Sequence, residues 1–172
     1  MKTLSLKSIF LILFILTCIL ILPVGVLSAE KQVVGWIENV IVFPGNFEIK
    51  AKLDTGAKNS SMHAVHIDEF KRNGHDWVRF EVVNRQGHTE TFETKVIRTA
   101  EIKRKNSESQ KRLVIRLGVC LGTFYKEAEV NLVNRGNFNY KMLIGRSFLK
   151  ESFIVDSEQT FTVKTKCQRT QN

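Results

Sequence analysis

The residues best suited to chemistry stand in one short segment, Asp54-Thr55-Gly56-Ala57, which directly follows the alternating run at residues 47–53. Alternation with period two predicts a strand, so the aspartate is expected at the end of that strand. Gly56 permits a sharp turn and a close backbone approach, and the Thr55 hydroxyl can join hydrogen bonds beneath the turn. A carboxylate fixed in this way is a candidate acid or base for hydrolysis, although Asp-Thr-Gly is also an ordinary turn tripeptide.

A second candidate segment lies far downstream, where the apolar residues 142–144 run into Gly145 and Arg146. Together, a predicted leading hairpin, the Asp-Thr-Gly-Ala turn and this late apolar-Gly-Arg segment resemble the retroviral aspartic proteases. The resemblance is closer still to a bacterial retropepsin-like family labelled ATP-dependent zinc proteases. The segments that carry it are residues 50–64, 77–80 and 143–146, within residues 33–163.

This resemblance implies an all-β fold, a retropepsin-like closed β-barrel with one or two short helices, and the activity of an aspartic endopeptidase without a cofactor. It also implies that Gly145 lets the late strand pass behind the catalytic turn. Arg146 would brace the dimer or the following helix, with an ordinary surface charge as an equal alternative. The implied site consists of the catalytic Asp54, the active-site turn Thr55, Gly56 and Ala57, and the structural residues Ile144, Gly145 and Arg146.

Peptide hydrolysis by aspartates requires two carboxylates a few ångströms apart that share one proton. The sequence has one Asp-Thr-Gly, and the other aspartates beyond residue 30 are Asp68, Asp76 and Asp156. Asp156 is the best rival, but no Thr-Gly turn follows it. The second carboxylate is therefore expected from Asp54 of another copy across a twofold axis, which predicts a homodimer that binds a peptide or protein substrate.

The residues do not fit the zinc and the ATP of that family label. Zinc peptidases place their ligands as in His-Glu-x-x-His, whereas His63 and His66 have no glutamate between them and His75 and His88 are isolated. The sequence also contains no phosphate-binding Gly-x-x-x-x-Gly-Lys-[Ser/Thr] loop. We therefore predict aspartic chemistry and no metal ligands.

Retropepsin-like proteases close a glycine-containing hairpin, the flap, over their substrate. Two predicted hairpin tips compete for this role: residues 84–88, with Gln86 and Gly87, and the basic tip at residues 105–109. The first tip has the glycine and the second leads more directly into the strand expected at residues 112–117, so the choice stays open.

The first 29 residues are typical of a signal peptide or an N-terminal membrane anchor. Lysines precede an apolar run over residues 9–22, Pro23 interrupts it, and small residues follow near residue 29. Residues 9–27 are of borderline length for a spanning helix, which needs about 20 apolar residues, so cleavage is favoured somewhat over anchoring in the inner membrane. Residues 30–172 are expected to form one exported, periplasmic domain.

The formal net charge is +9, or +7 without the two leader lysines. Because the basic clusters at residues 103–105 and 111–112 contain no aromatic residue, a nucleic-acid partner is not expected. Cys120 and Cys167 could pair in an oxidising compartment, but Cys120 lies in an apolar run, so a buried free thiol is an equal alternative.

Strands dominate the pattern after residue 31, whereas helical signal is confined to residues 67–72, which end at Asn73-Gly74, and to residues 146–150. The leading hypothesis is an exported, homodimeric aspartic endopeptidase. A non-catalytic peptide- or envelope-binding module with the same fold and a latent monomer are the alternatives. Strands are expected at residues 33–43, 47–53, 77–83, 89–97, 112–119, 124–133, 140–144 and 161–163.

Overall fold

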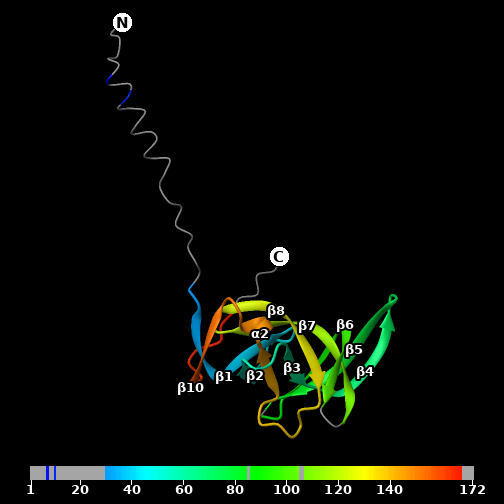
Figure 1. The fold of residues 1–172 in the computed structure, drawn as a ribbon. Coiled ribbons are helices and arrows are strands. Elements are labelled where there is room, and N and C mark those ends of the chain that lie inside the picture. Colours follow the sequence, from blue (N-terminus) through cyan, green and yellow to red (C-terminus); the bar gives the residue numbers. More distant parts are fainter. Residues whose placement is uncertain (1–6, 8–9, 11–29, 85, 105–106, 168–172) are drawn as a thin grey trace. The chain divides into compact units, whose positions relative to one another are not determined.

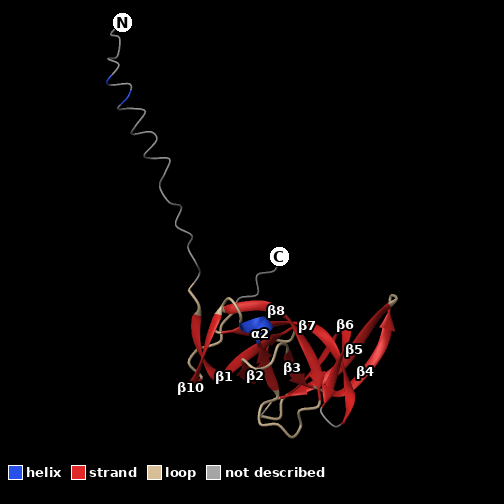
Figure 2. Ribbon diagram, viewed as in Figure 1, coloured by secondary structure: helices blue, strands red, loops and turns tan. Residues whose placement is uncertain are grey.

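The computed structural model describes residues 7, 10, 30–84, 86–104 and 107–167 of the 172-residue chain. The chain divides into two units, residues 1–30 and residues 31–172. In its described part, the second unit holds ten strands and one short helix (Figure 2). No helix among the described residues is long and apolar enough to cross a membrane. The expected leader falls almost entirely outside these residues, so its cleavage or anchoring stays a prediction.

Six strands pair around a closed ring, which makes a mixed β-barrel (Figure 1). The ring closes because the second half of the first strand pairs with the second strand on one side, at residues 37–42, and with the seventh strand on the other, at residues 40–43. The all-β closed barrel expected from the sequence is thereby confirmed. In order around the ring, the strands are β1 (Gln32–Phe43), β2 (Phe47–Asp54), β9 (Met142–Gly145), β3 (Ser60–His63), β8 (Phe124–Val133) and β7 (Ser107–Leu121).

The remaining strands extend the sheet at both of its ends. β10 (Phe153–Thr160) runs parallel to the start of β1. On the other side, β6 (Thr89–Arg104), β5 (His75–Val83) and β4 (Val65–Arg72) continue antiparallel from β7 as a wing, visible in Figure 1. The helix α2 (Arg146–Leu149) follows β9 directly, where the sequence predicts a helical turn.

Alternation along β2 separates the barrel interior from an outward-facing row of polar side chains. Phe47, Ile49, Ala51 and Leu53 are buried, as expected for the inward positions of a strand whose side chains alternate. The core continues into an aromatic cluster in which Phe148 of α2 packs on Phe124 and Phe153. The outward row, named here the β2 row, consists of Glu48, Lys50, Lys52 and Asp54.

The helical turn expected at residues 67–72 is wrong, because these residues belong to strand β4. β4 and β5 form a hairpin in which Arg72 pairs with His75, so the loop contains only Asn73 and Gly74. Both loop residues have positive φ, 51° and 76°. Asn-Gly favours this kind of two-residue hairpin turn as strongly as it favours a helix end, and pairing with β5 decides between them. The strand expected at residues 161–163 is also wrong, since β10 ends at Thr160.

A disulfide joins Cys120 of β7 to Cys167 in the C-terminal segment, which settles the alternatives left open by the sequence. The segment is held at further points along the barrel. The backbone N–H of Lys166 donates to the carbonyl of Gly122 at 2.8 Å. The backbone N–H of Thr162 donates at 2.8 Å to the buried carboxylate of Glu38. Residues 161–167 are therefore part of the folded unit although they form no strand.

We expect Cys167→Ser to lower the free energy of unfolding by about 2–4 kcal/mol, because the cross-link closes a long loop in the unfolded chain. The bond spans a sequence separation of 47. Urea unfolding followed by tryptophan fluorescence measures the change. A thiol reductant should destabilise the wild type by a similar amount and leave Cys167→Ser unaffected. Equal stability of the oxidised wild type and the variant would contradict this expectation.

Candidate active site

Asp54 ends β2 and presents its carboxylate at the start of a tight turn. Its Oδ1 accepts hydrogen bonds from the backbone N–H of Gly56 at 2.9 Å and of Ala57 at 3.2 Å. The backbone N–H of Ala57 also lies 3.3 Å from the carbonyl oxygen of Asp54. Among the described residues, no hydrogen bond involves Oδ2. One carboxylate oxygen is thus fixed by the turn, and the other is free to meet a water or a substrate.

Arg146 and the first turn of α2 hold the Asp54 turn from one side. The Arg146 Nη1 donates to the carbonyl oxygens of Thr55 and Gly56, both at 2.8 Å. The backbone N–H of Arg146 donates to the carbonyl of Ala57 at 2.9 Å. The side chain of Arg146 is exposed, yet it ties two consecutive carbonyls of the turn to the end of β9. Its charge is therefore engaged in the geometry of the turn.

Gly145 allows β9 to pass directly against the segment that follows the turn. It pairs with Asp54 in the parallel register of β2 and β9. A Cβ at this position would lie 2.6 Å from the carbonyl carbon of Asn59, a separation that backbone atoms do not tolerate. The neighbouring Ile144 is fully buried and pairs with Leu53. Gly145 therefore sets how closely the end of β9 approaches Lys58 and Asn59, and Ile144 holds β9 in the core beside β2.

Asp54 faces a hollow of about 330 Å³ on the outside of the barrel. Lys52 could have been expected there from the sequence, because it precedes Asp54 by two positions on the same strand face. Arg135 and Tyr140 had no such signal, because they come from the loop between β8 and β9. The hollow is lined by Trp36, Lys52, Asp54, Arg135, Phe138, Asn139, Tyr140 and Leu143.

Arg135 is a half-buried cation in the wall of this hollow. Its Nε donates to the carbonyl of Tyr140 at 3.1 Å, its Nη1 donates to the Ser61 hydroxyl at 3.3 Å, and its guanidinium lies 4.6 Å from the ring centre of Phe138. Burial and the nearby charge of Arg112 lower the pKa of Arg135, while the charge of Asp54 raises it. Since arginine stays protonated in either case, Arg135 places a fixed positive charge in the electrostatic field of Asp54.

His63 anchors the loop that carries Arg135. The ring is buried, with 7% of the residue exposed, and its Nδ1 accepts the backbone N–H of Arg135 at 2.9 Å. Burial lowers the pKa of His63, and the positive charges of Lys141 and Arg135 lower it further, against a hydrogen bond with the Val133 backbone. An accepting Nδ1 carries no proton, so His63 is neutral in this arrangement, with its proton on Nε2.

We predict that the stability of the protein falls as the pH drops below about 6.5, because the unfolded chain then binds a proton that folded His63 resists. The free energy of unfolding from urea titrations at several pH values measures this slope. His63→Asn keeps an acceptor for the Arg135 N–H but does not titrate, so its slope between about pH 6.5 and 5 should be flatter. Identical slopes in both proteins would assign the effect to other groups.

The hairpin tip with Gln86 and Gly87 does not line the Asp54 hollow. The backbone N–H groups of Gln86 and His88 donate to Oδ1 of Asn84 at 3.1 and 3.0 Å, which closes the turn. Asn84 and Gln86 line a second hollow together with Glu48 and Lys50 of β2. In the rival tip at residues 105–109, residues 105 and 106 lie outside the described residues, so the choice of flap stays open.

The histidines named by the sequence do not gather into a metal site. Within the described ranges, no group of three or more His, Cys, Asp or Glu side chains could hold an ion. His63 bonds to Arg135, whereas His66 lies on the surface with its Nδ1 at 2.9 Å from Glu81 Oε2. The two rings therefore have separate partners.

A closed six-stranded barrel with an Asp-Thr-Gly turn, backed by an apolar strand that ends in Gly-Arg, defines the class of retropepsin-like proteins. The family described as "Retropepsin-like aspartic endopeptidase RimB" matches residues 33–166, and the chain belongs to this RimB-like family. The resemblance drawn from the sequence is thereby confirmed, and the match includes every residue of the candidate site.

Similar proteins include longer chains with a different name. A "Probable alpha-L-glutamate ligase" from Shewanella pealeana is 39% identical over 145 residues, which is 81% of this chain and 31% of the relative. One of the same name from Desulfotalea psychrophila is 37% identical over 131 residues, which is 73% of this chain and 28% of the relative. The chain thus spans about a third of the length of these curated relatives.

A solved structure shares the fold over most of this chain. It is the crystal structure of a protein of unknown function (DUF785) from Legionella pneumophila, 34% identical, with a TM-score of 0.69. The likeness covers 78% of this chain and 100% of that one. The barrel is therefore the shared unit.

Proposed function

We propose that the protein is an exported aspartic endopeptidase that hydrolyses peptide bonds with a water held between two Asp54 carboxylates of a homodimer. The observation that carries the proposal is the state of Asp54 itself. Two backbone N–H groups fix one carboxylate oxygen, the other has no hydrogen bond among the described residues, and Asp54 lines an open hollow. A carboxylate held in this way can take a proton from water while it stays in place.

The second carboxylate is proposed to come from another copy of the chain. No other acidic side chain lines the described wall of the Asp54 hollow. The rival Asp156 is engaged within its own strand, where its two oxygens accept hydrogen bonds from Glu158 N and Gln159 Nε2, both at 2.9 Å. A twofold axis beside the Asp54 turn would bring two equivalent carboxylates together.

The chemistry then follows from a pair of carboxylates that share one proton. The ionised member removes a proton from water, whose oxygen attacks the peptide carbonyl, while the protonated member donates a hydrogen bond to the carbonyl oxygen. The tetrahedral intermediate collapses when the carboxyl that took the proton from water gives it to the amide nitrogen, so that the C–N bond breaks, an amine leaves and the pair again holds one proton. Only side chains of the protein take part, so the proposal includes no cofactor.

We further propose that the preferred substrate has acidic residues next to the bond that is cleaved. Lys52 and Arg135 place two cationic groups in the wall that contains Asp54. Paired N–H donors on a cation recognise a carboxylate well. The name of the longer relatives, a probable glutamate ligase, supports glutamate as that acidic residue.

Export is supported by two features of the chain. The first 29 residues have the pattern of a secretory leader or anchor. The disulfide between Cys120 and Cys167 is typical of an oxidising compartment. We propose the periplasm, with the barrel either released or attached to the inner membrane through residues 9–27.

A peptide- or envelope-binding module without catalysis is the second candidate function. It is favoured by the length of the relatives, in which the matched region is 31% or less of a chain named as a ligase. In such a chain, the barrel could serve to bind a peptide for another domain. The endopeptidase requires the Asp54 carboxylate as a base, whereas a binding module does not.

We expect Asp54→Asn to lower cleavage of an unfolded protein mixture by about 10²–10⁴-fold, because an amide cannot act as the base. Mass spectrometry of the products from purified wild type and variant, with and without a chelator, measures the loss. Chelator should leave the wild type unchanged. Full cleavage by the variant, or loss of cleavage with chelator, would refute the aspartic mechanism.

A mixture of the wild type and Asp54→Asn tests whether the site is shared between two subunits. If both Asp54 side chains are needed, unfolding and refolding equal amounts together should leave about a quarter of the activity of the same total amount of wild type. Independent monomers should retain about half. Sedimentation of the refolded mixture, which should match that of the wild type, controls for lost assembly.

We expect Lys52→Gln to reduce the preference for glutamate over glutamine beside the cleaved bond by about five- to tenfold, since one charge-assisted contact is lost. The ratio of kcat/KM for two peptides that differ only in that residue measures the preference. Lys164→Gln is the matched control, because Lys164 is exposed and lines neither hollow. An unchanged ratio in Lys52→Gln would show that the charge of Lys52 does not contribute to the preference for glutamate.

A further inference from the structure

The β2 row connects the Asp54 hollow with the second hollow on the outside of the barrel. Lys52 and Asp54 line the first, and Glu48 and Lys50 line the second. All four side chains leave the same face of one strand, because their neighbours in sequence point into the core. The two hollows meet along the row between Lys50, which lines the second, and Lys52, which lines the first.

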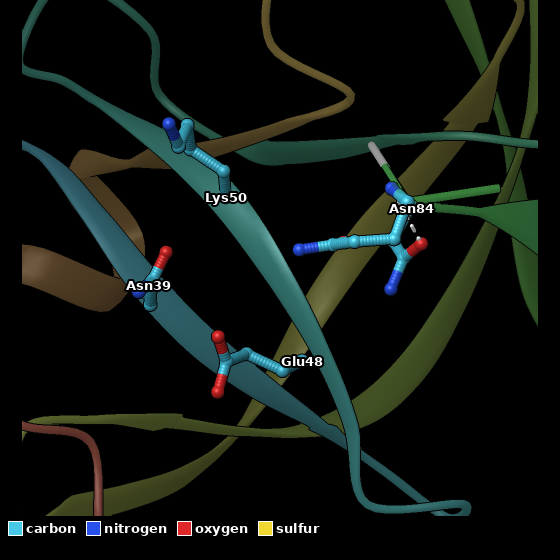
Figure 3. A pocket seen from close by; sticks show the side chains of 5 residues that line it. Asn39, Glu48, Lys50 and Asn84 are labelled. Atoms are coloured by element: carbon cyan, nitrogen blue, oxygen red, sulfur yellow. Dashed lines mark hydrogen bonds between the residues drawn. The ribbon is translucent and has the colours of Figure 1, made fainter. Parts of the chain in front are cut away.

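The second hollow has a volume of about 310 Å³ and a polar wall. Figure 3 shows Glu48 and Lys50 on β2, Asn39 on the neighbouring β1, and Asn84 facing them from the far side. Asn39 pairs with Lys50 across the two strands. The lining residues are Asn39, Glu48, Lys50, Asn84 and Gln86.

The polar groups of this wall are largely available to a ligand. Asn84 uses its Oδ1 to close its own turn, which fixes the side chain and leaves its amide N–H groups. No ion pair within the described ranges involves Glu48. The Lys50 ammonium lies 4.6 Å from the ring centre of Phe161. Carboxamides both donate and accept, as the main chain of an extended peptide does.

The spacing along the strand relates this hollow to Asp54. Glu48 and Asp54 are six residues apart, which corresponds to about 20 Å at ~3.3 Å per residue. A substrate stretched along the β2 row would therefore reach Glu48 with a residue about six positions from the bond at Asp54.

We propose that the second hollow is a binding site for an extended peptide, and that it holds the part of the substrate about six residues away from the cleaved bond. The link to cleavage rests on the proposed function, but the binding site does not. Carboxamides from both sides pair with the peptide main chain, and the Glu48 carboxylate favours a lysine or arginine of the ligand and disfavours an acidic residue. Asn84 and Gln86 then contact the distal part of the substrate.

The test uses three synthetic peptides that share a core of four glutamates, each labelled with fluorescein. One is the core alone, and the others extend it by eight neutral polar residues on the amino or the carboxyl side, with a lysine six positions from the core centre. Binding to full-length Asp54→Asn is measured by fluorescence anisotropy. One extended peptide should bind about tenfold more tightly than the core.

Glu48→Ala and Gln86→Ala, each added to Asp54→Asn, should remove most of this tenfold gain and leave binding of the core unchanged. Glu127→Ala is the matched control, because Glu127 is exposed on β8 and lines neither hollow. Thermal unfolding verifies that the variants are folded. Equal binding of the core and both extended peptides, or a gain that survives both substitutions, would overturn the proposal.

Cleavage of the same peptides separates this proposal from the proposed function. Protein with Asp54 intact should show a lower KM for the extended peptide, with a similar kcat, and Glu48→Ala should abolish the difference. Cleavage that does not depend on peptide length would refute the distal site while leaving the endopeptidase intact. A length-dependent gain in binding without any cleavage would support the site and count against the endopeptidase.

Discussion

The approach of β9 and α2 to the Asp54 turn is the constraint on which the site depends. A four-residue turn has carbonyl groups that the strand ladder does not satisfy. Here the guanidinium of Arg146 donates hydrogen bonds to the carbonyls of Thr55 and Gly56, and the backbone N–H at the start of α2 donates to the carbonyl of Ala57. This network needs the end of β9 directly against Lys58 and Asn59, and the missing side chain of Gly145 permits that approach. The geometry of the carboxylate is thus set by a strand from the other end of the chain.

The electrostatics of the site follow from a second long-range arrangement. The loop between β8 and β9 carries Arg135 to the hollow, and neutral His63 holds the backbone of that loop. If Nδ1 of His63 were protonated, the backbone N–H of Arg135 would lose its acceptor, and a third positive charge would stand beside Arg135 and Lys141. Burial prevents this at neutral pH, so the loop keeps its shape and Arg135 keeps its place near Asp54.

The sheet also organises how a substrate could lie on the protein. One strand, β2, supplies the carboxylate at its end and polar side chains for a second hollow near its start. The RimB-like family model matches residues 33–166, and the longer ligase-named relatives align in sequence with most of this chain.

The sequence by itself determined the all-β class, the β2 strand, the Asp-Thr-Gly turn with its Gly-Arg partner, and the helical turn after residue 145. These features have local signals: alternation, turn residues and short motifs. Only the tertiary structure decided that residues 67–72 form a strand and that Cys120 pairs with Cys167. It also decided that Arg135 and Asp54 line one hollow, and Gln86 and Glu48 another. His63 and Arg135 are 72 residues apart. Contacts of this kind are set by how the strands pair around the barrel, and local residue patterns do not encode that pairing.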